Sequence, residues 1–265
     1  MISVFELAEQ CLTSPDWPAK LELTHRAEQA RTAGQLTFER SGPPLPIDKV
    51  RLPVDLQFVE PRDLPQRKLN TLSGRIALLH AIAHIEFSAV MLHWDSLYRF
   101  QGMPISYYQD WLAVTLEELS HFNLLRSRLN ELGADYGQLP VHNGLWQVAK
   151  TTAHDVFDRM ALVPRHMEAR GLDVTPAMVA GLEKAGDTAS ATLLNKILAD
   201  EVGHVRLGSK WFRRLATQKG LSPGSAYFEL LDHHLKGAPR GPFNRTLRLE
   251  AGFSNWEIDH LEKTS

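Results

Sequence analysis

The chain is poor in the features that mark disulfide-rich, membrane-spanning and secreted proteins. It has a single cysteine, Cys11, among 265 residues, which excludes an intrachain disulfide and a cysteine-rich zinc or iron–sulfur site. We find no stretch that approaches the roughly 20 apolar residues of a membrane-spanning helix. The N-terminal residues lack the basic and apolar regions of a signal peptide. We therefore expect a soluble, cytoplasmic protein without a membrane partner.

An excess of charge of one sign is also missing. The sequence has 29 Lys and Arg against 31 Asp and Glu, a net charge of −2. This balance argues against nucleic-acid binding driven by charge alone. A local basic patch stays open as an alternative, because arginines gather toward the C-terminus (Arg213, Arg214, Arg240, Arg245 and Arg248).

Proline divides the N-terminal part from the rest of the chain. Residues 1–33 have the apolar spacing of helices. Six prolines fall within residues 41–65, a density that excludes a long helix and predicts an extended segment. This segment is expected to be anchored rather than flexible, because it also carries apolar side chains (Val50, Leu52, Val54, Leu56, Phe58 and Val59).

From about residue 72 the apolar spacing is that of long helices, and we find no convincing strand, so the predicted fold class is all-α. Pro164 predicts a kink or break in the third long helix. Gly171 is a plausible stop for that helix, and Thr175-Pro176 a start for the next one. Ser254 and Glu257 form the capping pattern of the last helix. The helices are expected at 73–98, 104–133, 145–171, 175–186, 187–218, 224–235 and 254–263.

Two short motifs carry the chemistry. Glu118 and His121 lie three residues apart, as do Glu201 and His204. On a helix this spacing places a carboxylate and an imidazole on one face, where both can bind the same metal ion. A single Glu-x-x-His pattern is weak evidence, because amphipathic helices often contain it by chance.

The spacing to an upstream glutamate strengthens the interpretation. Glu86 precedes Glu118 by 32 residues, and Glu168 precedes Glu201 by 33. The chain thus repeats a helix bearing Glu followed by a helix bearing Glu-x-x-His. This is the ligand set of di-iron and di-manganese carboxylate bundles. We predict that all six side chains converge on one site, and that residues 72–133 superpose on 143–218.

Together with three further runs, these motifs resemble a known superfamily. The runs are PRDLPQRKL at 61–69, HAIAHIE at 80–86 and EARGLD at 168–173. They resemble the ferritin-like superfamily of di-iron carboxylate proteins, and within it a bacterial branch known as a domain-of-unknown-function family. A more distant similarity is to the tRNA-modifying di-iron hydroxylase. The resemblance covers most of the chain.

The resemblance implies a fold and a cofactor. The fold is a ferritin-like four-helix bundle at 72–218, with helical and extended residues 1–71 before it and a helical extension 219–265 after it. The cofactor is a pair of iron ions, with manganese or a mixed Mn/Fe pair as the alternative. Glu117 and Asp200 would orient a ligand histidine on a facing helix, and His84 is a further candidate for such a supporting role.

Two classes of function follow. The first is an O2-dependent oxidoreductase, an oxygenase, hydroxylase or oxidase, acting on a small molecule or a modified base that the sequence does not identify. The second is a non-catalytic iron- or manganese-binding protein that resembles a storage protein. The long additions at both ends favour the enzyme, because they are large enough to enclose an apolar pocket beside the metals. His80 and His84 are interpreted as core or supporting histidines. His93 and His154 are interpreted as core positions, with a lining or hydrogen-bonding role as the alternative. The adjoining His233 and His234 are interpreted as a solvated helix end.

Overall fold

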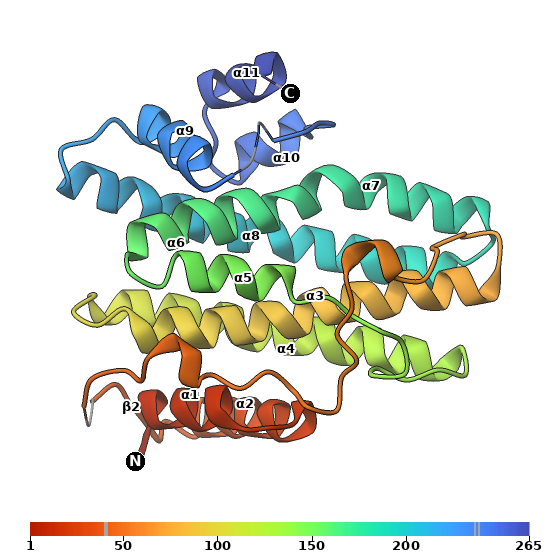
Figure 1. Ribbon diagram of the computed structural model, residues 1–265, viewed down its shortest axis with the longest axis horizontal. Coiled ribbons are helices and arrows are strands. Elements are labelled where there is room, and N and C mark those ends of the chain that lie inside the picture. The colour runs from red at the N-terminus through yellow and green to blue at the C-terminus, as the bar shows by residue number, and fades with distance from the viewer. Residues whose placement is uncertain (40–41, 236, 238, 265) are drawn as a thin grey trace. The chain divides into compact units, whose positions relative to one another are not determined.

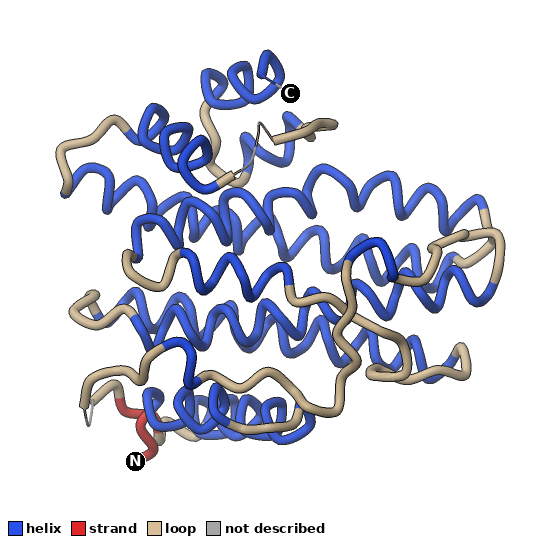
Figure 2. The backbone as a smooth tube through the Cα atoms, viewed as in Figure 1, coloured by secondary structure: helices blue, strands red, loops and turns tan. Residues whose placement is uncertain are grey.

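The computed structural model is predominantly helical, which confirms the predicted all-α class (Figures 1 and 2). It describes residues 1–39, 42–235, 237 and 239–264, so Ser41, the first residue of the predicted extended segment, lies outside the described residues. Two strands of two residues each, Ile2–Ser3 (β1) and Leu36–Thr37 (β2), pair in parallel. The expectation that no strand forms is wrong for this short pair.

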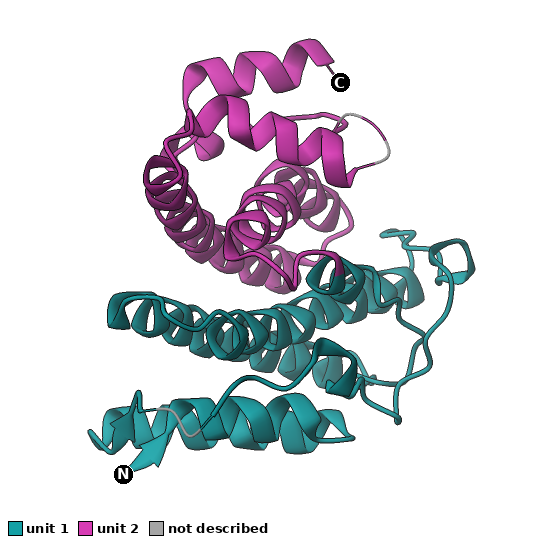
Figure 3. Cartoon of the chain, turned by 60° about the vertical axis from the view of Figure 1, so that its left-hand side comes forward, with its two compact units in different colours: residues 1–150 teal, residues 151–265 magenta. Residues whose placement is uncertain are grey.

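The chain divides into two compact units, residues 1–150 and residues 151–265 (Figure 3). The division falls between His121 and Glu168, inside the predicted second half of the sequence repeat (143–218). One unit therefore carries Glu86 with Glu118 and His121, and the other carries Glu168 with Glu201 and His204.

Unit 1 begins with two helices, α1 (Val4–Thr13) and α2 (Trp17–Thr32), as the sequence predicts for residues 1–33. The fully buried Lys20 donates hydrogen bonds from Nζ to the carbonyl oxygens of Cys11 (2.8 Å) and Leu12 (3.3 Å). These carbonyls belong to the last turn of α1, where backbone acceptors have no helical partner. Lys20 therefore joins the two helices while it caps the first.

The proline-rich segment is extended and anchored, as predicted. Its described residues form two 3-10 turns, η1 (Ile47–Lys49) and η2 (Pro61–Asp63), and an isolated β-bridge between Phe58 and Val141. Its backbone N–H groups at Arg51 and Val54 donate to carbonyl groups at the end of α1 and in the following turn. Leu56 is buried, whereas the Val54 side chain is 81% exposed, so the anchoring involves only some of the apolar residues.

The core of unit 1 is the pair α3 (Leu72–Arg99) and α4 (Ile105–Glu131), which lie side by side (Figure 1). The Oγ1 atom of Thr71 accepts a hydrogen bond from the N–H of Gly74 (3.1 Å) and so caps α3. By length and composition α3 could cross a membrane, contrary to the sequence expectation, yet its most apolar window is mostly buried, as in the core helix of a soluble protein. The helix α5 (Gly144–Thr151) follows.

Unit 2 begins where the sequence predicts a single helix over 145–171. That prediction is wrong: α5 ends at Thr151, and α6 (Val156–Leu162) begins after a turn. A π-helix, η3 (Val163–Glu168), continues α6, so the predicted irregularity at Pro164 takes this form. Pro164 has no N–H and cannot complete a regular α-helical ladder, which accounts for the change of winding.

The bounds of helix α7 (Ala169–Lys184) show that two further expectations are wrong. Gly171 does not end a helix, and Thr175-Pro176 does not begin one, because both positions lie inside α7. The helix buries Leu172, Val179 and Leu182 and packs against α8 (Thr188–Gln218). Burial of apolar side chains on both sides of Pro176 outweighs the local helix-breaking signal.

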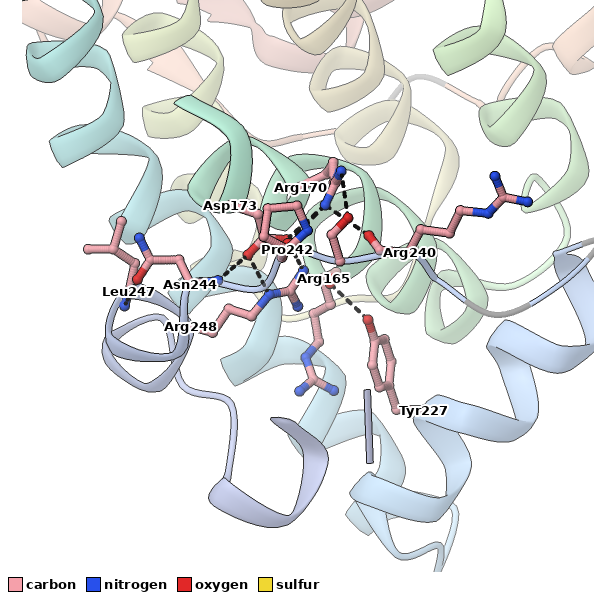
Figure 4. A network of polar contacts seen from close by, with 10 residues as sticks. Arg165, Arg170, Asp173, Tyr227, Arg240, Pro242, Asn244, Leu247 and Arg248 are labelled. Carbon is pink, nitrogen blue, oxygen red and sulfur yellow. Dashed lines mark hydrogen bonds and ion pairs between the residues drawn. The ribbon is translucent and has the colours of Figure 1, made fainter. Parts of the chain in front are cut away.

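The last three helices are α9 (Pro223–His234), α10 (Arg245–Glu250) and α11 (Asn255–Thr264). The sequence predicts the first and third of these, and α10 is an addition. Figure 4 shows how α10 is fastened to α7: the guanidinium of Arg248 donates to both oxygens of Asp173, at 2.9 and 2.7 Å. Both side chains are almost fully buried.

A second buried pair fastens α11. The Nη2 atom of Arg165 lies 2.7 Å from the Oε1 atom of Glu257, and the Arg165 guanidinium stacks over the rings of Tyr227 and Phe253. The Tyr227 hydroxyl donates to the Arg165 carbonyl oxygen (2.9 Å, Figure 4). The predicted capping pattern is confirmed, since Ser254 and Glu257 exchange side-chain and backbone hydrogen bonds at 3.2 and 2.8 Å.

Candidate metal centre

Three of the predicted ligands meet inside unit 1. Glu86 lies on α3, and Glu118 and His121 lie on α4. One ligand atom from each lies within 4.8 Å of the others. The Nδ1 atom of His121 is 3.2 Å from Oε2 of Glu86 and 3.6 Å from Oε2 of Glu118. All three residues are buried, at 4% exposure or less.

The charge of this group requires compensation. Two carboxylates and one imidazole are buried together, and buried charges are costly unless they are paired. Burial lowers the pKa of His121, but hydrogen bonds and charge–charge interactions with Glu118 and Glu86 outweigh it and raise the pKa to about 11. A divalent cation is also suited to this group, because the donor set of carboxylate oxygen and imidazole nitrogen fits such an ion.

His93 also belongs to this site, although the sequence analysis interpreted it as a core position. Its Nε2 atom lies 3.6 Å from Oε1 of Glu118, and its ring stacks on Trp111 with centroids 4.9 Å apart. The available signal was its place seven residues after Glu86, on the same helix face. A buried histidine can be a core residue or part of a binding site. Only the position of α4 shows that His93 faces Glu118.

Unit 2 holds the second half of the motif. On α8 the Nδ1 atom of His204 is 3.5 Å from Oε1 of Glu201. Glu168 is the last residue of the π-helix η3, which packs against α8. π-helical turns often occur at functional sites, because they redirect one side chain without ending the helix.

The proposed supporting residues lie in different settings. Glu117 is exposed on α4, and the Oδ2 atom of Asp200 accepts a hydrogen bond from Lys196 Nζ (3.0 Å) at the surface of α8. His84 is buried, and its Nε2 atom is 2.9 Å from the carbonyl oxygen of His142. Because a carbonyl only accepts, Nε2 carries the proton, and Nδ1 accepts from the Tyr136 hydroxyl (2.9 Å). The supporting role of each stays a prediction.

His80 and His84 are both held neutral. Burial, the largest cause, lowers the pKa of each to about 4. The Nε2 atom of His80 accepts hydrogen bonds from the N–H groups of Gly137 (3.0 Å) and Leu139 (3.4 Å). These contacts agree with the interpretation of both residues as core histidines.

Unit 1 contains a small pocket between the extended segment and α3. Phe58 lines it from the segment, and His84, Phe87 and Met91 line it from one face of α3. Glu86 is about 200° around the helix from His84. This pocket therefore opens on the face of α3 away from Glu86, and it is not the apolar pocket beside the metals that the sequence predicts.

The structure thus brings Glu86, Glu118 and His121 together in one unit, and Glu201 and His204 together in the other. The convergence of all six ligands and the superposition of the two halves stay predictions.

Comparison with known proteins gives the family of the chain. Residues 13–259 match the family described as "Protein of unknown function (DUF455)". A protein of Haemophilus influenzae, described as "Uncharacterized protein", is 42% identical over 211 residues, which cover 77% of this chain and 73% of the relative. No solved structure matches the chain. The chain belongs to the DUF455 family.

Proposed function

We propose that the protein is a di-metal oxidoreductase that uses O2. Two metal ions per chain, most favourably iron, would be held by six side chains, three from each unit (Glu86, Glu118, His121, Glu168, Glu201 and His204). Manganese or a mixed Mn/Fe pair is the alternative. The observation that carries the proposal is the buried group of two carboxylates and one imidazole in unit 1.

The chemistry of the donors supports iron or manganese. Carboxylate oxygens are hard ligands, and the set contains no thiolate, so ions that prefer sulfur are disfavoured. The lone thiol, Cys11, is buried beside Thr24 and Met91 and takes no part in the group. Burial, the largest cause, raises the pKa of Cys11 to about 11, so it is a thiol rather than a thiolate ligand.

The ferritin-like four-helix bundle belongs to the same proposal. In it α3 and α4 would form one helix pair, and the continuous segment from α6 to α7 would pair with α8. The support is that each unit presents one Glu on its first long helical segment and Glu-x-x-His on its second.

The chain's own residues would bind the metal ions, orient the ligand side chains and shield them from water. Bound iron would supply the electrons for the reduction of O2. Glu118 is oriented from two sides, by His121 on its own helix and by His93 on α3. Trp111 and Phe122 are fully buried on α4 and would exclude water from the carboxylates. The organic substrate, a small molecule or a modified base, is left unspecified.

A non-catalytic iron- or manganese-binding protein is the second candidate. One observation favours it: the pocket described in unit 1 lies on the face of α3 away from Glu86. In this alternative the same six ligands would bind or oxidise metal without turnover of an organic substrate. Both candidates are proposed to act in the cytoplasm.

Consumption of O2 by the Fe(II)-loaded protein tests the proposal. The wild type is compared with Glu118→Ala and His204→Ala, one ligand from each unit, with and without candidate substrates. Glu131→Ala is the matched control, because Glu131 lies on α4 like Glu118 but forms an exposed pair with Arg128. We expect rapid consumption by the wild type and the control only. Equal rates in all four proteins would rule out the oxidoreductase. Consumption by the wild type that no substrate changes favours the second candidate.

A further inference from the structure

A second group of metal-binding side chains lies in unit 2, apart from the six proposed ligands. It consists of His154, Asp158 and His234. The Nε2 atoms of both histidines contact the same carboxylate oxygen, Oδ2 of Asp158, at 3.2 Å from His154 and 2.8 Å from His234. Two imidazole nitrogens and one carboxylate oxygen are the protein ligands of many zinc sites that keep one position open to solvent.

The fold brings these three residues together from separate segments. His154 lies in the turn before α6, Asp158 lies in the first turn of α6, and His234 is the last residue of α9. The helices α6 and α9 pack against each other. His234 and Asp158 are 76 residues apart in sequence, so the tertiary packing alone creates the pair.

The turn that carries His154 is fixed by a different carboxylate. Asp155 Oδ1 accepts a hydrogen bond from the N–H of Phe157 (2.8 Å) and so caps α6. Asp155 Oδ2 pairs with Nζ of Lys219 at 3.0 Å. Asp155 therefore positions the turn while its own charge is balanced, and Asp158 is the carboxylate that faces both histidines.

Burial differs among the three side chains in a way that suits metal entry. Asp158 and His234 are 11% and 10% exposed, whereas His154 is 65% exposed. Two ligands are thus held in place, and the third can move toward them from solvent. The ring centroids of His154 and His234 are 6.5 Å apart and the rings are tilted by 34°, so the two imidazoles approach Asp158 without stacking on each other.

The group is separate from the proposed di-metal ligands. Asp158 precedes Glu168 by ten residues on the continuous segment formed by α6 and η3. At about 1.5 Å per residue this corresponds to about 15 Å along the helix axis. The inference therefore does not rest on the proposed function and can stand or fall without it.

We propose that His154, Asp158 and His234 bind one divalent transition-metal ion, with zinc as the best match. The two imidazoles and the carboxylate supply three ligands, and solvent completes the coordination. The bound ion would fasten the end of α9 to the start of α6. Without metal, His234 is hydrogen-bonded to Oδ2 of Asp158, and His154 contacts the same oxygen.

Zinc titration of the full chain, followed by calorimetry, tests the site. Wild type is compared with His234→Gln and Asp158→Asn, which remove a ligand or its charge while keeping a similar shape. His25→Gln is the matched control, because His25 also contacts a carboxylate, Glu28 at 3.5 Å, but without a second histidine. We expect both site variants to lose one zinc equivalent, or to bind it at least about tenfold more weakly. The control should bind as the wild type does.

Cobalt provides a second measurement that reports on ligand type. Co(II) in an N/O site of low coordination number gives visible absorption bands, and these should be weaker in both site variants. If His234→Gln fails to fold, His154→Gln replaces it, because the exposed His154 side chain contributes little to packing. Equal zinc stoichiometry and affinity in wild type and site variants would overturn the proposal. Loss of the same equivalent in His25→Gln would also overturn it.

Discussion

The Nδ1 atom of His121 lies 3.2 Å from the Oε2 atom of Glu86, although the two residues are 35 positions apart in sequence. One belongs to α4 and the other to α3, so the register between these helices decides whether the contact forms. Glu118 joins the pair because it lies one helical turn before His121. Two carboxylates and one imidazole are therefore presented to a common point by two packed helices.

Removal of one carboxylate from this group should weaken metal binding. We expect Glu86→Gln to bind Mn(II) or Fe(II) at least about tenfold more weakly than wild type, because an amide carries no charge to offset the ion. Equilibrium titration under anaerobic conditions measures the affinity. Glu131→Gln, an exposed change on α4, serves as the control. If both variants bind like wild type, Glu86 is not a ligand.

The contact between α8 and the π-helix η3 should not accommodate a methyl group at Gly208. A Cβ atom added at Gly208 would lie 2.3 Å from Cβ of Pro164. We expect Gly208→Ala to lower the free energy of unfolding by about 1–3 kcal/mol, since overpacking forces the backbone to shift. Chemical denaturation measures the change.

A glycine on the same helix supplies the control for this prediction. At Gly203 a Cβ atom would meet no neighbour within 4 Å, so Gly203→Ala should be neutral or stabilising by up to about 1 kcal/mol. Adding Pro164→Gly to Gly208→Ala should recover part of the lost stability. Equal effects of the two alanine substitutions would show that the π-helix is not held by this contact.

The buried pair between Arg248 and Asp173 should be important for the stability of unit 2. We expect Asp173→Asn to lower the free energy of unfolding by about 3–5 kcal/mol, because it leaves a buried guanidinium without a balancing charge. Asp259→Asn, in contrast, should leave the free energy of unfolding almost unchanged, since its pair with Arg245 is solvent-exposed. Urea denaturation of the two variants measures both values. Similar small costs would show that the buried pair does not stabilise the unit.

The stability of unit 1 should fall in acid because of His80. Its pKa of about 4 in the folded chain lies below the ordinary 6.5, so the unfolded chain binds the proton first as the pH falls. The contribution of neutral His80 to the free energy of unfolding is therefore fully present above pH 6.5 and is lost as the pH falls toward 4. We expect the difference in free energy of unfolding between wild type and His80→Gln to shrink by about 2 kcal/mol between pH 7 and pH 4.5. This value allows for the charge of Asp135, which favours the protonated form.

Denaturation with urea at the two pH values measures this difference. A gap that stays constant between pH 7 and pH 4.5 would show that His80 titrates alike in the folded and unfolded chain.

Much of the local structure could be predicted from the sequence. The apolar spacing gave α3, α4 and α8 to within two residues at each end. The spacing of Glu118 and His121 sufficed to place both on one helix face, because helix geometry is local. The pairing of Ser254 with Glu257 was likewise predictable from three residues of separation.

Other features were decided only by the tertiary structure. Thr175-Pro176 has the local signature of a helix start, yet the burial of α7 against α8 keeps the helix continuous through Pro176. His93 meets Glu118, and His234 meets Asp158, across contacts between helices far apart in sequence. A sequence pattern specifies which face of a helix is apolar, but the register and neighbours of that face follow from the packing of the whole unit. Residues that share one helix face, such as Glu118 and His121, could therefore be identified from the sequence, whereas the contacts made by His93 and His234 were decided by the fold.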